Sequence, residues 1–162
     1  MRIAMVLALG LTLAACGGGG DEPGAKTAAA PEVTDADRQV ILASLPAPYN
    51  AGALENGRRR FAQCRSCHTV TDGGQDLVGP NLHGVFGRKI ASKPGYDYSE
   101  AAEGAGFVWD GARLDGWLAD PRGFLPGTKM AFPGIKTEPD RRDVIAYLMV
   151  ETGYRPTATP AS

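Results

Sequence analysis

The stretch Cys64-Arg65-Ser66-Cys67-His68 decides the fold, because two cysteines stand two residues apart and a histidine follows at once. This C-x-x-C-H pattern is typical of covalent c-type haem attachment. Each thiol can add across one vinyl group of the porphyrin, and a short helical turn brings both sulfurs to the same edge of the ring. The imidazole of His68 then projects at the iron from one face. The motif therefore predicts one haem c, bound covalently through Cys64 and Cys67.

Two other interpretations of a cysteine pair are weaker here. A thioredoxin-like redox pair belongs beside alternating strands and helices, which the sequence around Cys64 does not predict. A zinc site needs further ligands, and the chain has no second C-x-x-C and only one other histidine, His83. The third cysteine, Cys16, lies in a motif of a different kind.

The N-terminus predicts export and attachment to a membrane. A basic start and an apolar run too short for a comfortable transmembrane helix indicate a signal peptide over 1–15. The run ends in Leu13-Ala14-Ala15-Cys16, which resembles a bacterial lipobox and so implies a lipid on the Cys16 sulfur. Ordinary secretory cleavage after Ala15, which would leave a free thiol, is the alternative. Each buried CH₂ of an acyl chain contributes about 0.8 kcal/mol, so two or three chains would anchor the protein stably.

The rest of the chain divides by composition. Residues 16–33 are rich in Gly, Ala and small polar residues and predict a flexible tether. Residues 34–50 predict a short helix, at about 35–44, and a linker. The folded domain is expected over 51–154, and 155–162 is expected to be a frayed tail. The formal net charge is −1 and no basic cluster has interleaved aromatics, so no nucleic-acid partner is expected.

The first predicted helix has both a cap and an apolar stripe. Thr34 and Asp37 resemble a capping box, with Asp where Glu is usual. Val40, Ile41 and Leu45 form the stripe, which we expect to pack on the domain or to stiffen the tether.

Capping residues and apolar spacing predict the other helices. A helix from Gly52 to Gln63 runs into the haem motif, and Gly57 within it suggests close contact with a second helix. Further helices are expected around Ser99 to Glu103, from an Asp110 cap to Ala119, and from a Thr137–Asp140 cap to about Glu151 with Gly153 at C′.

A sixth iron ligand is expected if the haem only carries electrons. Met1 and Met5 lie in the signal peptide, and Met149 lies within the last predicted helix, where its side chain suits the core. Met130 lies in a loop bounded by Gly and Pro, where the backbone can bring the thioether to the iron. His83 is the rival, although its loop lies close to the proximal side, and an open or other site is the remaining alternative. Histidine and methionine together raise the reduction potential.

The proximal imidazole also needs an acceptor for its second N–H, often a backbone carbonyl. Pro80 has a carbonyl and no N–H, so it suits this position. We therefore expect Pro80 to lie beside His68.

These motifs together resemble class I cytochrome c of the mitochondrial and alphaproteobacterial type, here in a bacterial lipoprotein form. The resemblance covers about 55–152. It rests on Cys64-x-x-Cys67-His68, Gly79-Pro80-Asn81-Leu82-His83-Gly84, Pro94-Gly95-Tyr96-x-Tyr98, Trp109, and Pro126-Gly127-Thr128-Lys129-Met130-Ala131-Phe132. It implies an all-α fold, the class I cytochrome c fold, with about four to five helices wrapped around one covalently bound haem.

The resemblance also implies residue roles. His68 and Met130 would be the axial iron ligands, and the carbonyl of Pro80 would accept from His68. Two departures from the family concern the same pocket: Trp117 stands where many relatives place Tyr beside the methionine, and Ala102 stands where many place Asn near a propionate.

Three further residues would bind the haem propionates by the same resemblance. Arg88, Tyr98 and Trp109 would hydrogen-bond or neutralise them, because buried carboxylates need partners. The alternative is an ordinary surface cation and two aromatic core residues.

The function implied is that of a membrane-anchored monohaem electron carrier, not an enzyme. It would be periplasmic and monomeric, with quinol–cytochrome c reductase as donor and a terminal oxidase or another periplasmic acceptor. The alternatives are a subunit held permanently in an oxidase or reductase complex, a haem peroxidase, and a gas sensor. Lysines are few in the domain, so long-range steering toward an acidic partner is expected to be weak; they are Lys89, Lys93, Lys129 and Lys136.

Overall fold

The computed structural model describes residues 33–155. Within this range the regular structure is helical, apart from one isolated β-bridge between Lys89 and Val108, so the all-α prediction is confirmed. The predicted signal peptide, Cys16 and nearly all of the predicted tether and tail lie outside the described residues. Of the helices between 33 and 155, none has the length and apolar character needed to cross a membrane.

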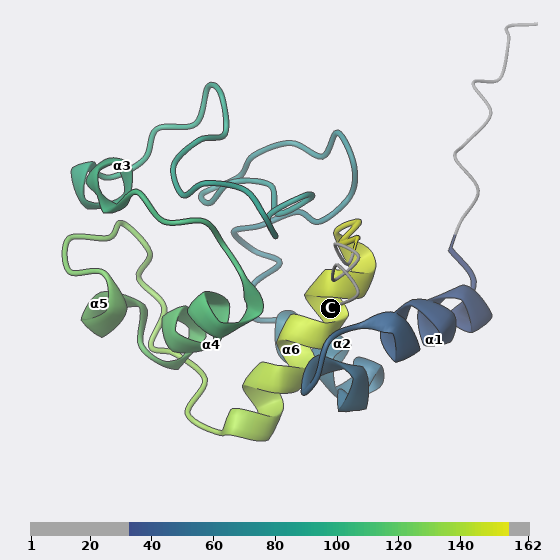
Figure 1. Cartoon of the computed structure of the whole chain (residues 1–162). Helices are drawn as coiled ribbons and strands as arrows, with labels where there is room; N and C mark the ends of the chain where they lie inside the picture. The colour runs from purple at the N-terminus through teal and green to yellow at the C-terminus, as the bar shows by residue number, and fades with distance from the viewer. Residues whose placement is uncertain (1–32, 156–162) are drawn as a thin grey trace, which may run out of the picture. The chain divides into compact units, whose positions relative to one another are not determined.

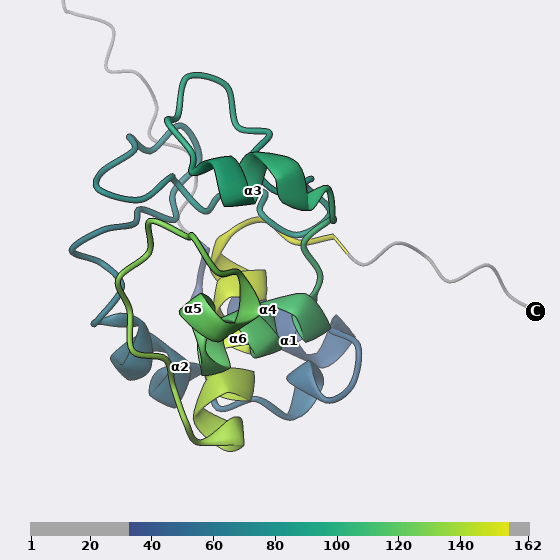
Figure 2. The same cartoon turned by 90° about the vertical axis from the view of Figure 1, so that its left-hand side faces the viewer.

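Six α-helices and one 3₁₀ turn are described, and long loops connect several of them (Figure 1 and Figure 2). Five of the helices, α2 to α6, fall within the predicted domain, in line with the expected four to five. The elements are α1 (Asp35–Ser44), η1 (Tyr49–Ala51), α2 (Leu54–Phe61), α3 (Glu100–Ala105), α4 (Gly111–Ala119), α5 (Pro121–Phe124) and α6 (Glu138–Glu151).

The crossing of α2 and α6 is the centre of the fold (Figure 1). Gly57 makes it possible, because a Cβ on this residue would lie 2.7 Å from the Cβ of Tyr147 and against the backbone of Asp143. Phe61, one turn later on α2, is 1% exposed, and its ring centroid lies 5.5 Å from that of Tyr147. The predicted close approach at Gly57 is confirmed.

Helix α1 begins with the predicted capping box. The Thr34 side chain accepts from the Asp37 N–H, and the Asp37 carboxylate accepts from the Thr34 N–H. Leu42 and Leu45 are buried, whereas Val40 is 72% exposed, so its predicted place in the apolar stripe is wrong. The reason is helical geometry: two residues span about 200° of helix rotation, so Val40 lies opposite Leu42.

An ion pair fastens α1 to α6. The Arg38 Nε donates to Glu151 Oε1 at 2.7 Å, with both side chains partly buried. The segment over 34–50 therefore packs on the domain, the first of the two roles expected for it.

Helices α4 and α5 are consecutive. Asp110 caps α4 as predicted, by accepting from the Arg113 N–H at 2.7 Å. Helix α4 ends at Ala119 as expected, and Pro121 begins a further helix, α5, which the sequence did not predict. The Asp120 side chain caps this short helix by accepting from the Gly123 N–H.

The start of α6 is built differently from the prediction. Thr137 is the N-cap residue, but its side chain makes no capping hydrogen bond. The Asp140 carboxylate instead accepts from Asn56 Nδ2 at 2.9 Å and pairs with Arg60 at 2.9 Å, which ties α6 to α2. At the other end Gly153 has a φ of +75°, as its predicted C′ position requires.

Asp143 is a buried polar junction between α2 and α6. Its side chain is 5% exposed and accepts from the Ala53 N–H at 3.0 Å and from Asn56 Nδ2 at 2.8 Å. Burial opposes ionisation of this carboxyl, but the hydrogen bonds from Asn56, Ala53 and Arg142 outweigh burial and lower its pKa. The ionised carboxylate thus satisfies donors at the start of α2.

Candidate haem site

The C-x-x-C-H motif continues directly from the end of α2. The Cys64 N–H donates to the Phe61 carbonyl at 2.8 Å, and the Cys67 and His68 N–H groups both donate to the Cys64 carbonyl, at 3.0 and 2.9 Å. This turn brings the backbones of Cys64, Cys67 and His68 close together, as attachment to one edge of a porphyrin requires. Both side chains are free thiols and partly buried.

Burial controls the protonation of Cys64. Desolvation, with a smaller contribution from nearby Cys67, raises the pKa of the Cys64 thiol to about 11. At neutral pH this group is therefore a thiol, the form whose S–H adds across a vinyl double bond.

The structure brings His68 and Pro80 together. Nδ1 of His68 lies 2.7 Å from the Pro80 carbonyl oxygen, so Nδ1 carries the proton and donates. Burial lowers the pKa of His68, while the bond to Pro80 acts in the opposite sense. The result is a neutral imidazole whose Nε2 lone pair is free to bind a metal.

Gly79 makes room for this imidazole. A Cβ at Gly79 would lie 2.7 Å from both ring nitrogens of His68. The Gly79 N–H also donates to the Cys67 carbonyl at 2.8 Å, which holds the loop against the haem motif. This close approach explains why glycine precedes Pro80.

Asn81 organises the same loop, a role that the sequence analysis missed. It is 4% exposed, and its Nδ2 donates to Thr69 Oγ1 at 2.6 Å and to the Thr71 carbonyl at 3.0 Å. Its Oδ1 accepts from the His83 N–H at 2.9 Å, and its own N–H donates to Asp76 Oδ1 at 2.7 Å. The only signal in the sequence was an Asn within a Gly/Pro-rich loop.

Arg88 lies beside this loop. Nη1 donates to the His83 carbonyl at 3.1 Å, and Nη2 donates to the Asn81 carbonyl at 3.2 Å. The Arg88 carbonyl accepts from the Trp109 N–H at 2.9 Å, which joins two of the predicted propionate residues. Arg88 thus has a structural role in holding this loop.

The other predicted propionate residues belong to aromatic groups. Trp109 packs edge-on against Phe107, at 4.8 Å between ring centroids, and against Trp117 at 5.5 Å. Tyr98 packs edge-on against Tyr96 at 4.7 Å, and burial raises the pKa of Tyr98. The indole of Trp117 is therefore fixed by aromatic packing, against Trp109 and also against Phe124.

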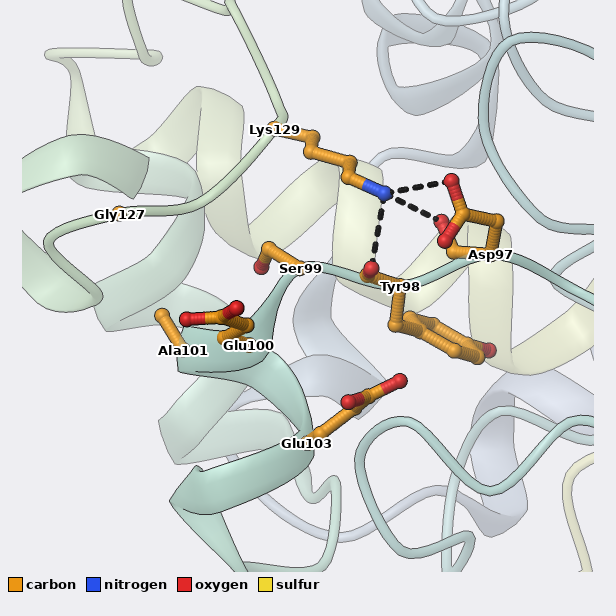
Figure 3. A pocket seen from close by; sticks show the side chains of 8 residues that line it. All are labelled: Asp97, Tyr98, Ser99, Glu100, Ala101, Glu103, Gly127 and Lys129. Carbon is orange, nitrogen blue, oxygen red and sulfur yellow. Dashed lines mark hydrogen bonds and ion pairs between the residues drawn. The ribbon is translucent and has the colours of Figure 1, made fainter.

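Hydrogen bonds position the loop that carries Met130, which is half-buried. The Met130 N–H donates to Thr128 Oγ1 at 3.2 Å. The Lys129 ammonium donates to Asp97 Oδ2 at 2.7 Å and to the Tyr98 carbonyl at 2.8 Å, as Figure 3 shows. The residue beside Met130 is thus fastened to the segment that contains Tyr98.

His83, the rival ligand, contacts the end of α6. A Cβ on Gly153 would lie 3.0 Å from the His83 ring. Nε2 of His83 lies 3.8 Å from Asp72 Oδ1, and the side chain is 32% exposed. Its ring therefore takes part in loop packing at the C-terminus of α6.

These residues fit a covalent haem by their chemistry. One helical turn offers two thiols and a neutral imidazole with a free Nε2, and the glycine beside that ring leaves space that a side chain would fill. A half-buried thioether offers a further soft ligand. When bound, haem supplies iron that gains and loses one electron.

Comparison with known proteins identifies the family. The cytochrome c family model matches residues 54–150. Cytochrome c of Kluyveromyces lactis is 44% identical over 106 residues, which cover 65% of this chain and 96% of that protein. Cytochrome c2 of Rhodomicrobium vannielii is 44% identical over 105 residues, covering 65% and 84%.

Comparison with a solved structure supports the same family. Cytochrome cH from Methylobacterium extorquens is 44% identical, covers 60% of this chain and 97% of its own, and superposes with a TM-score of 0.56. The family implies covalent haem c, and Cys64 and Cys67 are present to hold it. The chain therefore belongs to the cytochrome c family, as a monohaem class I electron carrier and not an enzyme.

Proposed function

We propose that this protein is a lipid-anchored cytochrome of the periplasm that carries single electrons between membrane complexes. Quinol–cytochrome c reductase is the proposed donor, and a terminal oxidase or another periplasmic acceptor is the proposed recipient. His68 and Met130 are the proposed axial ligands, and Arg88, Tyr98 and Trp109 the proposed propionate partners.

The observation that carries the ligand assignment is the hydrogen bond between His68 and Pro80. It fixes the ring orientation and leaves only Nε2 for the iron. Met130 supports a closed site, because hydrogen bonds of Thr128 and Lys129 hold the loop directly before it. A site closed on both faces changes little between oxidation states, which favours electron transfer over a peroxidase or gas-sensor function.

The ligand assignment is tested by carbon monoxide binding and by the ferric thioether-to-iron absorption band. The ferrous protein should not bind CO rapidly, and the ferric band should be present. Met130→Ala should abolish the band and admit CO, whereas His83→Ala, which removes the rival ligand, should keep the band. Rapid CO binding by the unmodified protein, or a band that survives in Met130→Ala, would reject the assignment.

Membrane attachment rests on the lipobox-like sequence ending at Cys16 and on the paired lysines of the domain. Lys93 and Lys129 form ion pairs with Asp76 and Asp97, both at 2.7 Å, which weakens long-range attraction to acidic partners. A tether would compensate by raising the effective concentration at the membrane.

Replacing Cys16 tests the anchor. Cys16→Ala should release the haem-loaded protein into the soluble periplasmic fraction and slow its reduction or oxidation by the membrane. Unchanged electron flow at native abundance would refute the role of the tether. Co-purification with an oxidase or reductase in mild detergent would instead favour the permanent-subunit alternative.

A further inference from the structure

Two aliphatic side chains are exposed beside the haem-attachment motif. Val78 is 79% exposed and Leu77 is 38% exposed, and Val78 is the most exposed large hydrophobic residue among those described. The Leu77 N–H donates to the Gly79 carbonyl at 2.9 Å, and the Gly79 N–H donates to the Cys67 carbonyl at 2.8 Å. The aliphatic pair is therefore held in a fixed turn against the segment that attaches haem.

The same surface continues to the segment that carries Met130. The Tyr96 hydroxyl donates to the Val78 carbonyl at 2.6 Å, and the Tyr96 ring packs on Tyr98. The Tyr98 carbonyl in turn accepts from Lys129, the neighbour of Met130, at 2.8 Å (Figure 3). Contacts thus run without a break from the proximal loop to the residue before the proposed second ligand.

The cations of this surface are neutralised within the protein. Lys93 Nζ lies 2.7 Å from Asp76 Oδ2, and both side chains are only about a quarter exposed. Lys129 Nζ lies 2.7 Å from Asp97 Oδ2 and also donates to two backbone carbonyls, those of Asp97 and Tyr98. The aliphatic pair follows Asp76 of one ion pair and is bonded to Tyr96, the neighbour of Asp97 in the other, so these groups add no surplus of positive charge.

We propose that Leu77, Val78, Tyr96 and the flanking pairs Lys93–Asp76 and Lys129–Asp97 form a docking surface, here named the Val78 surface. Its occupant is a redox partner whose own docking surface is uncharged and apolar. The proposal deepens the proposed function and rests on it.

Charge complementarity decides the chemistry of the occupant. An acidic partner would have to compete with Asp76 and Asp97 for the two lysines, at the cost of breaking ion pairs that are already formed. An uncharged partner leaves these pairs intact and covers Val78, in keeping with the scarcity of charge in the core of protein interfaces. A single exposed aliphatic residue needs no explanation, but here the exposed pair coincides with a neutral surface that joins both sides of the haem site.

Protein-film voltammetry provides a test with defined probes. The haem-loaded full chain carrying Cys16→Ala, which cannot be acylated at that residue, is adsorbed on gold coated with either a mixed methyl- and hydroxyl-terminated monolayer or a carboxylate-terminated one. Electron exchange between the haem and the electrode should be faster on the uncharged layer. It should also change little between about 0.01 M and about 1 M salt, a range over which the Debye length falls from about 30 Å to about 3 Å.

Two substitutions locate the effect. Val78→Asp should slow exchange on the uncharged layer by about fivefold or more, as expected when a contact at the centre of an interface is lost. Val40→Asp, which places the same charge at the exposed Val40 of α1, should leave the rate unchanged. Equal rates for the two variants, or faster and salt-sensitive exchange on the carboxylate layer, would overturn the proposal.

A redox titration with soluble mediators separates this proposal from the proposed function. If the haem does not cycle reversibly in solution, the electron-carrier function fails. If it cycles normally in both variants and Val78→Asp does not slow exchange at the uncharged layer, only the Val78 surface is rejected.

Discussion

Replacing Gly57 with alanine tests the crossing of α2 and α6. Two effects oppose each other. Alanine is favoured over glycine within a helix by about 1 kcal/mol, whereas overpacking a tight contact costs about 1–3 kcal/mol. At Gly57 the added Cβ would press on the backbone of Asp143 and lie 2.7 Å from the Cβ of Tyr147, and neither atom can move by changing a rotamer.

The steric cost should therefore lie at the top of its range. The net loss in the free energy of unfolding should be about 2 kcal/mol, which lowers the melting temperature by roughly 8 °C in a domain of this size. Denaturant unfolding of the haem-loaded protein, followed by far-ultraviolet circular dichroism, measures the loss.

Gly104→Ala is the matched control, because Gly104 lies in α3 and an added Cβ would meet no atom within 4 Å. It should stabilise the protein by up to about 1 kcal/mol, since only the helix preference remains. If Gly57→Ala were as stable as the unmodified protein, the close packing of α2 on α6 would not be the reason for this glycine.

Three further changes test other parts of the structure. Leu42→Ala should cost about 2–3 kcal/mol in denaturant unfolding because its side chain is buried, whereas Val40→Ala on the exposed side of α1 should stay within about 0.5 kcal/mol; equal costs would contradict the packing of α1. The pKa of Asp143 is lowered by folding, so its ionised form stabilises the protein above the unfolded pKa of about 3.9. This contribution is lost as pH falls through the folded pKa, so the stability of Asp143→Asn should fall less steeply below about pH 4 than that of the unmodified protein. Parallel curves of unfolding free energy against pH for the two proteins would count against this role. Gly79→Ala should displace the His68 ring from the Pro80 carbonyl and shift the haem midpoint potential, and an unchanged potential and absorption spectrum would argue against the tight fit of the ring.

Local features of the sequence predicted their structural counterparts well. The capping box of Thr34 and Asp37 depends on residues three apart, and the cap at Asp110 likewise depends on its own turn. Gly57 was informative for a different reason: glycine is costly inside a helix, so its presence indicated a close neighbour. The acceptor role of the Pro80 carbonyl followed from the chemical need of a proximal imidazole.

Features that depend on distant parts of the chain escaped prediction. The neutralisation of Lys129 by Asp97 joins residues 32 positions apart, and no pattern in the sequence pairs them. Thr137 is the N-cap residue of α6 but makes no capping hydrogen bond, while Asp140 bonds to Asn56 of α2, a distant contact that a local motif does not predict. Val40 was misplaced because a ten-residue helix with few apolar residues leaves its inward direction poorly defined.

The attachment of α1 to α6 has a mechanical consequence. The first described helix contacts the last one through Arg38 and Glu151, which are 113 positions apart. A pulling force applied at the N-terminus therefore loads this contact and the buried Leu42 before it reaches the crossing of α2 and α6. Helix α1 should therefore detach before the crossing of α2 and α6 opens, which leaves the candidate haem site intact under a moderate pulling force.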